Sequence, residues 1–215
     1  MTAWRDRLWQ LMEAEVFPAP SSDRLFNPYR DTHPAYDKPG APVVRRANLR
    51  AALDALPRKP RVLVVAEAPG PWGCRFSGVP LVSEQQLLDP AYPVTGHPTS
   101  QRAAHGEPIK EYSGAIYWRV MQPYWGRFWT WNTVPLHPHK PDEPLTIRTP
   151  TAGEVRAWHG LLAALIAGLR PATVVAVGRK AEGALTTIGA EPVYVRHPSQ
   201  GGATLFADGI RDLLG

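Results

Sequence analysis

The chain has 215 residues, which is long enough for one α/β domain with a buried core but short for two. Its 24 Lys and Arg residues outnumber its 19 Asp and Glu residues, and the formal charge of +5 favours an anionic partner without identifying it. The single cysteine, Cys74, excludes an intrachain disulfide and any four-cysteine zinc or iron–sulfur site.

The distribution of apolar residues predicts a soluble protein. Residues 1–17 carry charges among their apolar positions and therefore lack the uninterrupted apolar core of a signal peptide. No run approaches the roughly 18 apolar residues that a membrane span needs. Because a lone cysteine also fits a reducing compartment, we expect a cytoplasmic protein that makes no contact with a membrane.

The first 60 residues are expected to form a helix, a proline-rich arm and a lead-in helix, all packed on a core domain that spans residues 61–215. Thr2 is the expected cap of the first helix. Residues 18–43 are dense in Pro, Asp, Tyr and Arg, which predicts an extended arm without regular structure. We interpret this arm as an irregular wrap, with a direct role in binding as the alternative. The lead-in helix is expected from about residue 44 to residue 56.

Strands and helices then alternate along the chain. The apolar run at residues 61–66 is typical of a strand buried on both faces. Further strands are expected at residues 127–134, 172–177 and 192–195. Helices are expected from the capping box of Ser83 and Gln86, at residues 113–124, from Thr151 to about residue 169, at residues 180–188 and at residues 205–214. This alternation predicts a parallel sheet covered by helices on both faces.

Three unusual loops follow the expected strands. In an open parallel sheet, ligands bind beyond the carboxyl ends of the strands, where such loops converge. The first loop, residues 67–81, is rich in glycine, but its spacing matches neither a dinucleotide fingerprint nor a P-loop, so a phosphate cradle is disfavoured. The second loop carries Asn132 and the third carries His197. One amide and one imidazole should therefore face the same crevice.

Each of these residues also has a simpler explanation. Asn132 could be a turn residue that satisfies backbone groups, and His197 could be a loop histidine with ordinary partners. His137 and His139 invite a metal interpretation, but no third and fourth ligand stands at a recognisable spacing. Cys74 could be an activated thiol, although no histidine is placed by sequence to serve it.

Taken together, the loops resemble the motifs of a known enzyme family. Residues 68–73 (APGPWG) with 78–81 (GVPL), residues 132–136 (NTVPL) and residues 197–199 (HPS) resemble uracil-DNA glycosylases, especially the single-strand-selective monofunctional class. Residues 67–70 (EAPG) are also similar to the thermostable iron–sulfur class, whose cluster Cys74 alone cannot hold. The resemblance covers about residues 61–214. It implies a three-layer α/β/α fold with a four-stranded parallel sheet in the order 2-1-3-4.

The chemistry of base excision explains the residue types that the resemblance brings with it. An enzyme that acts on a base must extrude the base from the stack and read its pairing edge. The amide of Asn132 offers an acceptor for uracil N3–H and donors for O4, whereas cytosine presents the opposite pattern. Bond cleavage leaves negative charge on the departing base, and by resemblance His197 is the catalytic histidine that donates to O2. Backbone amides in the loop that contains Ala68 and Gly70 would share this task.

Two positions near the base depart from the family pattern. Ala68 stands where the family has a catalytic Asp or Asn, as it does in the active iron–sulfur class. Glu67 is the nearest carboxylate that could orient the attacking water, and it could instead point into the fold and hold the loop. Leu81 stands where the family has a stacking phenylalanine, so either the platform is aliphatic or Phe76 replaces it.

The loop after the catalytic histidine also departs from the family. Gln200, Gly201 and Gly202 replace the usual wedge that fills the vacated stack, so extrusion from intact duplex is expected to be inefficient. Arg196 or Gln200 would fill the gap less well. The expected DNA contacts are Arg196, Ser199, Gln200 and Gly201.

Three functions stay open on the sequence. The first is a monofunctional glycosylase that removes uracil or a related deaminated base from DNA during base excision repair. The second is an inactive or weakly active member that binds uracil or DNA, which Ala68 makes credible. The third is an enzyme acting on a free nucleobase or nucleoside, which the positive charge disfavours. We expect a monomer without metal or cofactor, and single-stranded or mismatched DNA with a uracil-like base as its partner.

Overall fold

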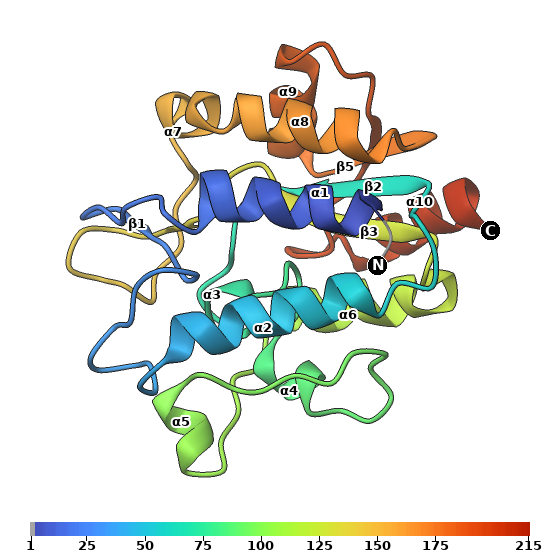
Figure 1. Cartoon of the computed structure of the whole chain (residues 1–215). Coiled ribbons are helices and arrows are strands. Elements are labelled where there is room, and N and C mark those ends of the chain that lie inside the picture. The colour runs from blue at the N-terminus through green and yellow to red at the C-terminus, as the bar shows by residue number, and fades with distance from the viewer. Residues whose placement is uncertain (1–2) are drawn as a thin grey trace.

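A four-stranded parallel sheet lies at the centre of the computed structural model, which describes residues 3–215 (Figure 1). Its strands are β2 (Val62–Ala66), β3 (Phe128–Asn132), β5 (Thr173–Val177) and β6 (Val193–Val195). They lie in the order β3-β2-β5-β6, which confirms the predicted order 2-1-3-4. All five residues of β2 are buried, as the apolar run predicts, because strands flank it on both edges and helices cover its faces.

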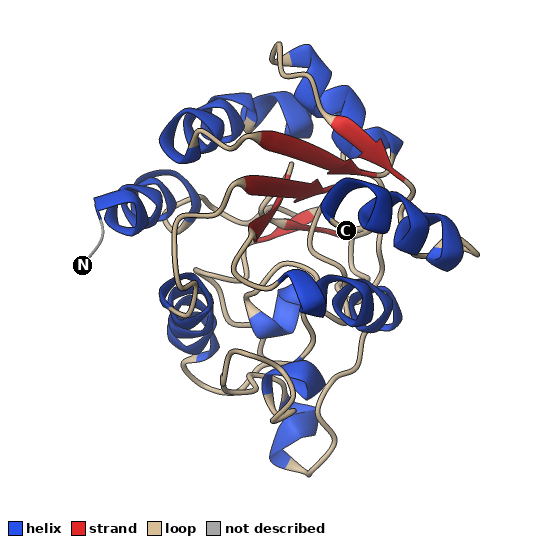
Figure 2. Ribbon diagram, turned by 90° about the vertical axis from the view of Figure 1, so that its right-hand side faces the viewer, coloured by secondary structure: helices blue, strands red, loops and turns tan. Residues whose placement is uncertain are grey.

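Helices form a layer on each side of the sheet (Figures 1 and 2). On one side lie α8 (His159–Leu169) and α9 (Arg179–Thr187), and α1 (Ala3–Leu11) packs on α8. On the other side lie α2 (Ala41–Asp54) and α6 (Tyr112–Met121), with α10 (Ala203–Leu214) packed against α6 and β6. The remaining helical pieces are a π-helical turn (Met12–Val16), α3 (Cys74–Ser77), α4 (Glu84–Leu87), α5 (Gln101–Ala104), a 3-10 turn (Gln122–Tyr124) and α7 (Ala152–Ala157). The sheet with its two helical layers confirms the predicted α/β/α architecture. No helix among the described residues is long and apolar enough to cross a membrane.

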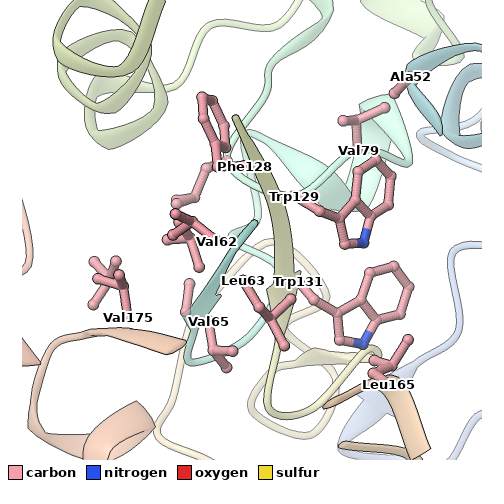
Figure 3. Close-up of a cluster of buried hydrophobic side chains, with 14 of the residues drawn as sticks. Ala52, Val62, Leu63, Val65, Val79, Phe128, Trp129, Trp131, Leu165 and Val175 are labelled. Carbon is pink, nitrogen blue, oxygen red and sulfur yellow. The ribbon is translucent and has the colours of Figure 1, made fainter. Parts of the chain in front are cut away.

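Tryptophans from the edge strand β3 account for much of the apolar core. Trp129 and Trp131 project from the same side of β3 toward Ala52, Val79 and Leu165 (Figure 3). Trp131 is 1% exposed, and a buried ring of this size removes roughly 150–250 Å² from water. Aromatic side chains therefore pack beside the edge strand β3 and hold in place the loop that follows it.

Two helix boundaries differ from the sequence prediction. The capping box at Thr151 is present, with Glu154 N–H donating to Thr151 Oγ1 and Thr151 N–H donating to Glu154 Oε2. The single helix expected beyond it is divided into α7 and α8, because Trp158 leaves the helical conformation and packs its ring against the core. The lead-in helix begins at Ala41 rather than near residue 44, since Pro42 is accommodated in the first turn.

The arm at residues 18–43 packs on the domain as an irregular wrap, with one short strand that the sequence did not predict. This strand, β1 (Leu25–Phe26), pairs antiparallel with β4 (His137–Pro138). Asp37 anchors the arm, because its Oδ1 lies 2.6 Å from Arg45 Nη2 and 2.7 Å from Arg75 Nη1, with all three side chains buried. The expected cap, Thr2, lies outside the described residues.

Candidate active site

The three loops singled out in the sequence all leave the carboxyl edge of the sheet, where the first two contact each other and the third lies beside the loop after β5. Thr133 N–H donates to the Ala66 carbonyl at 2.8 Å, and its Oγ1 donates to the Glu67 carbonyl at 2.6 Å, which joins the first two loops. Gly178, after β5, lies beside His197, because a side chain at Gly178 would contact the His197 Cβ at 3.4 Å. The connection from β2 leads to its neighbour β3 on one side of the sheet, and the connection from β5 leads to β6 on the other side. The carboxyl ends of β2 and β5 therefore form the switch point where open α/β sheets bind ligands.

Asn132 ends β3, where the sheet pairs it with Ala66. The residue is 4% exposed, yet its amide makes no hydrogen bond with any residue that the structure describes. Asn48, which is equally buried, donates to two carbonyls and accepts a backbone N–H. The turn explanation requires the Asn132 amide to satisfy the backbone, and no such bond is found in the described chain. An amide that stays unbonded within the chain at a residue with so little exposure is available to a ligand.

His197 follows β6 and has a defined tautomer. Its Nδ1 accepts the backbone N–H of Ser199 at 3.2 Å and lies 2.7 Å from the Ser199 hydroxyl. Burial, and to a smaller degree the charge of Arg196, lower the pKa of His197. A neutral imidazole whose Nδ1 accepts a hydrogen bond carries its proton on Nε2. His197 therefore presents an N–H donor rather than a cation.

Glu67 lies at the end of β2 with a carboxyl group that is poorly satisfied. Its Oε1 is buried without a hydrogen-bond partner among the described residues. Burial raises the pKa of Glu67, against the opposing influence of the Lys180 charge and of Thr149. Its backbone carbonyl, by contrast, accepts from Val134 N–H and Thr133 Oγ1. The main chain of Glu67 thus holds the two loops together, while the Oε1 atom of its side chain has no partner among the described residues.

The two candidate stacking residues are both buried, Leu81 at 8% exposure, and differ in their surroundings and backbone conformation. Phe76 is 1% exposed, and its ring lies under the guanidinium groups of Arg75 and Arg45, at 4.1 and 5.9 Å from the ring centre. The structure leaves that ring no open face for a base. Leu81 has a φ of +57°, a left-handed conformation that is strained for a leucine. Such strain is concentrated at functional sites, and it favours Leu81 over Phe76 as the platform.

The loop that replaces the usual wedge is a tight turn. Gln200 and Gly201 have φ angles of +52° and +74°, and a side chain at Gly202 would overlap the His197 carbonyl. The Arg196 guanidinium lies 3.5 Å from the Gln200 carbonyl. Of the expected DNA contacts in this loop, Gln200 is the most exposed side chain, and Ser199 orients His197 as well.

The structure adds one acidic residue that the sequence prediction missed. Glu111 precedes α6 as its N-cap residue, but its side chain makes no capping bond. The carboxyl group lies between Gly70, Gly73 and Gly114, where a side chain on any of these glycines would overlap it. Its Oε2 is buried without a partner in the described chain, and burial raises the pKa of Glu111 to about 7. The sequence carries no local signal for this contact, which joins distant segments.

The alternative chemistries at His137, His139 and Cys74 find structural explanations instead. His137 Nδ1 lies 2.8 Å from the Pro69 carbonyl, and His139 Nδ1 lies 2.9 Å from the Lys140 carbonyl. Across residues 3–215, no group of three His, Cys, Asp or Glu residues could hold a metal ion. Burial raises the pKa of the Cys74 thiol to about 12, which keeps it unreactive.

A cleft of about 740 Å³ opens beside the first loop. It is lined by Trp72, Gln85, Arg102, Gly106, Glu107, Pro108, Ile109 and Lys110. Trp72 is 39% exposed and belongs to the same loop as Gly70 and Gly73. The cleft therefore shares the first loop with the candidate site and offers an aromatic ring with two cations, one of which, Arg102, pairs with Glu107.

Comparisons with known proteins identify the family and the fold. A family model described as the Uracil DNA glycosylase superfamily matches residues 53–207, which is most of the chain. Among solved structures, the crystal structure of wild-type SMUG2 from Pedobacter heparinus is similar with a TM-score of 0.66 and 12% sequence identity. That match covers 99% of this chain and 97% of the other, and at this identity it shows a shared fold. No curated protein matches the chain.

Proposed function

The chain belongs to the uracil DNA glycosylase superfamily, and we propose that it is a monomeric, monofunctional DNA glycosylase that hydrolyses the N-glycosidic bond of uracil or a related deaminated base. The observation that carries this proposal is the amide of Asn132, which makes no hydrogen bond within the described chain although the residue is only 4% exposed and ends β3 at the carboxyl side of the sheet. His197 follows β6 at the carboxyl side of the same sheet. The activity would serve base excision repair. Hydrolysis of this bond needs only water and no cofactor.

In this proposal Asn132 reads the extruded base. Uracil presents an acceptor, a donor and an acceptor along its pairing edge, and one amide can accept from N3–H while donating to O4. Because no described residue occupies the Asn132 amide, it loses no hydrogen bond within the chain when the base arrives. Cytosine would place its amine against the amide donors, so the arrangement favours uracil.

His197 stabilises the leaving group. The departing base carries negative charge on O2 in the transition state, and a fixed N–H donor is worth most at the atom where charge develops. The bonds from Ser199 to Nδ1 leave Nε2–H as that donor. A neutral histidine also avoids strong binding of the uncharged substrate, so its effect falls on the rate rather than on ground-state affinity.

Glu67 is the residue we assign to the attacking water. Ala68 cannot orient a water molecule, and Glu67 beside it has a buried, unpartnered Oε1. A raised pKa makes the Glu67 carboxylate a stronger base, which helps it to accept a proton from water. Leu81 would support the face of the base, while backbone amides between Ala68 and Gly73 would share the charge on O2.

Single-stranded or mismatched DNA is the substrate form that the surface suits best. The turn at Gln200 and Gly201 offers no apolar wedge to hold duplex open. The cleft beside the site presents the Trp72 ring, and a base that stacks on such a ring gains roughly 1–3 kcal/mol without sequence preference. Lys110 in the cleft and Arg196 in the loop of His197 supply positive charge for phosphates.

The second candidate function is binding of uracil-containing DNA without turnover, which the alanine at position 68 favours. A gel assay decides between the two. Single-stranded oligonucleotides with one uracil are incubated with the protein and treated with alkali, which cuts the strand wherever a base has been removed. Cleavage supports the glycosylase, whereas tight binding without cleavage supports the second candidate. If the protein neither binds nor cleaves these oligonucleotides, both candidate functions are rejected.

A further inference from the structure

The amino edge of the sheet carries a cluster of positively charged side chains. Arg61 and Arg127 stand directly before β2 and β3, and the Arg61 N–H donates to the Arg127 carbonyl at 3.1 Å. On the other side of β2, the Ala172 N–H donates to the Arg61 carbonyl at 2.7 Å, which brings Arg170 to the same edge. Two more cations lead into β2. We call the five residues the amino-edge cluster: Arg58, Lys59, Arg61, Arg127 and Arg170.

This cluster lies at the opposite end of the sheet from the candidate site. The strands begin at the end of the molecule where the C-terminus lies, and the loops that carry Asn132 and His197 leave the other end (Figure 1). The five residues of β2 alone separate the two ends by roughly 17 Å, at about 3.3 Å per residue. A base held at the candidate site is therefore too far away to occupy the cluster.

Structural contacts explain only part of the cluster. Arg170 is the C-cap residue of α8, and Arg127 Nη1 donates to the Leu214 carbonyl at 2.6 Å, so both cations complement helix ends. The side chains of Arg58 and Arg61 are exposed and that of Lys59 is half-buried. None of these three forms a hydrogen bond or an ion pair within the part of the chain that the structure describes. Three neighbouring cations are thus left without a structural role.

The acids near this edge do not balance the cluster. Asp54 is the acid that precedes β2 most closely, and its carboxylate pairs with Arg50 at 2.8 Å. Glu191 stands before β6, beyond β5, and Asp212 lies in the last turn of α10. The formal charge of the whole chain is +5, so neutralising five cations would remove its entire excess. A positive excess gathered at one place attracts a polyanion.

A single nucleic-acid strand is the polyanion that suits this surface. Four of the five cations are arginines, which can bind one phosphate with two N–H groups. Pro57 and Pro60 restrict the backbone on either side of two of them. The Arg127 guanidinium lies 5.6 Å from the centre of the Tyr124 ring, so an aromatic side chain stands beside the cations. Cations next to an aromatic ring are typical of surfaces that hold single strands by phosphates and stacked bases.

We propose that the amino-edge cluster is a second nucleic-acid surface, which binds phosphates of a single strand outside the candidate site. The surface is separate from the proposed function and does not depend on whether the protein excises a base. A long strand that reaches both places is bound more tightly than its parts, because the second contact becomes intramolecular. A short strand with a base in the candidate site cannot make this second contact.

A salt series on short and long DNA tests the proposal. The oligonucleotides have about 8 nucleotides, enough for one site, or about 40, enough to reach both. Each carries one 2′-fluoro-2′-deoxyuridine, whose glycosidic bond resists hydrolysis, and fluorescence anisotropy gives the dissociation constants. One phosphate contact on a single strand adds about 0.7 to the slope of log affinity against log salt concentration. Arg58→Gln combined with Lys59→Gln should therefore lower this slope by about 1.4 on long DNA and leave it unchanged on short DNA.

A matched pair of substitutions controls for charge alone. Lys140→Gln combined with Arg156→Gln also removes one lysine and one arginine, both exposed, from the segment after β4 and from α7. This control should leave both slopes unchanged, and thermal unfolding shows that both variants fold. If the cluster variant keeps the parent slope on long DNA, loses as much on short DNA, or loses no more than the control, the proposal is wrong.

A competitor tests the chemistry of the partner. Poly-glutamate with the same total charge as the long DNA should displace that DNA from the parent protein only weakly, because it offers neither phosphates nor bases. Equal competition by poly-glutamate and by unlabelled long DNA would assign the cluster to acidic chains in general and overturn the nucleic-acid proposal. A protein that fails to excise uracil rejects the proposed glycosylase alone, because every measurement here is of binding.

Discussion

Two glutamates in the segment between β2 and β3 have opposite surroundings: Glu84 is fully buried, whereas Glu111 is partly buried. The Glu84 carboxylate accepts from the backbone N–H groups of Thr99, Ser100 and Ile109 at 2.6, 2.7 and 3.0 Å, and from the Ser100 hydroxyl at 2.5 Å. The Glu111 carboxyl group accepts from no described residue. Glu84 closes the loop between α4 and α6 and is complete without a ligand. The Glu111 carboxyl group has unused hydrogen-bond acceptors, as expected of a group that binds a ligand.

The same contrast, between side chains with and without hydrogen-bond partners, is found for two asparagines and two histidines. Asn48 is fully bonded beside the loop that Glu84 closes, whereas Asn132 at the sheet edge is not. The two ring nitrogens of His137 lie 2.8 and 3.2 Å from backbone carbonyls, whereas His197 keeps Nε2 free of partners in the described chain. We infer that satisfied groups set the stability of this fold and that unsatisfied groups set its chemistry.

The largest expected effect is on stability at Glu84. Glu84→Ala leaves three backbone N–H groups and a hydroxyl without their acceptor in a buried place. We expect the free energy of unfolding to fall by about 4 kcal/mol, since each stranded buried donor costs 1 kcal/mol or more. Urea unfolding monitored by tryptophan fluorescence measures it. A variant as stable as the parent would break the contrast between the two glutamates.

The pH dependence of stability is the next largest effect, and it isolates Glu111. Burial raises the pKa of Glu111 from 4.5 to about 7, so between these values the folded chain holds a proton that the unfolded chain has released. Stability from this group is therefore complete below pH 4.5 and is lost as the pH rises to 7, by about 3 kcal/mol. In Glu111→Gln, the free energy of unfolding should lack this part of its dependence on pH. If the free energy of unfolding changes with pH in the same way for parent and variant across this range, the prediction is wrong.

The two histidines sharpen the contrast in the rate of base excision. His197→Ala should lower kcat by about 100-fold or more while leaving stability and DNA affinity nearly unchanged, because the N–H donor acts in the transition state. His137→Ala is the matched control, and we expect it to lower stability first. Single-turnover excision and thermal unfolding of both variants provide the measurements. Equal losses of affinity and rate in His197→Ala would give that histidine a structural role.

The two asparagines differ in a smaller, more specific way. Asn132→Asp replaces the donors that meet O4 by an acceptor, so uracil excision should fall by about 10-fold or more, and residual activity should shift toward cytosine. Because the substitution places a carboxyl group at a residue that is only 4% exposed, we also expect some loss of stability, and the rates are compared for folded protein. Steady-state rates on matched uracil and cytosine oligonucleotides decide this. A variant that excises uracil as well as the parent would return Asn132 to the turn interpretation.

The smallest effect is expected in the cleft. Trp72→Ala should raise the dissociation constant for single-stranded DNA by about 5-fold, at the low end of what one stacked base contributes, with little change in kcat. Trp72→Phe keeps a ring and should recover most of the affinity. Fluorescence anisotropy with labelled oligonucleotides follows both. An unchanged affinity in the alanine variant would place the DNA path elsewhere.

The parts of the fold that the sequence predicted correctly depend on local pattern. The strand at residues 61–66 and the capping box at Thr151 follow from neighbours along the chain, and the resemblance of three short motifs supplied the strand order. What was missed depends on contacts between distant segments. Pairing of β1 with β4 needs a partner strand far along the chain, and the break at Trp158 needs a core for the ring to enter. Glu111 in its glycine cradle is the same kind of feature.

Asp37 has a consequence for how the molecule can be divided. Its carboxylate lies in the arm, Arg45 lies in α2, and Arg75 lies in α3 within the loop that carries Ala68 and Gly70. A shortened chain that begins at residue 61 would lose the counter-charge of Arg75 and bury a lone guanidinium group, which a protein interior tolerates poorly. The arm and the loop should therefore open and close as one cooperative unit, with linked rates of amide hydrogen exchange.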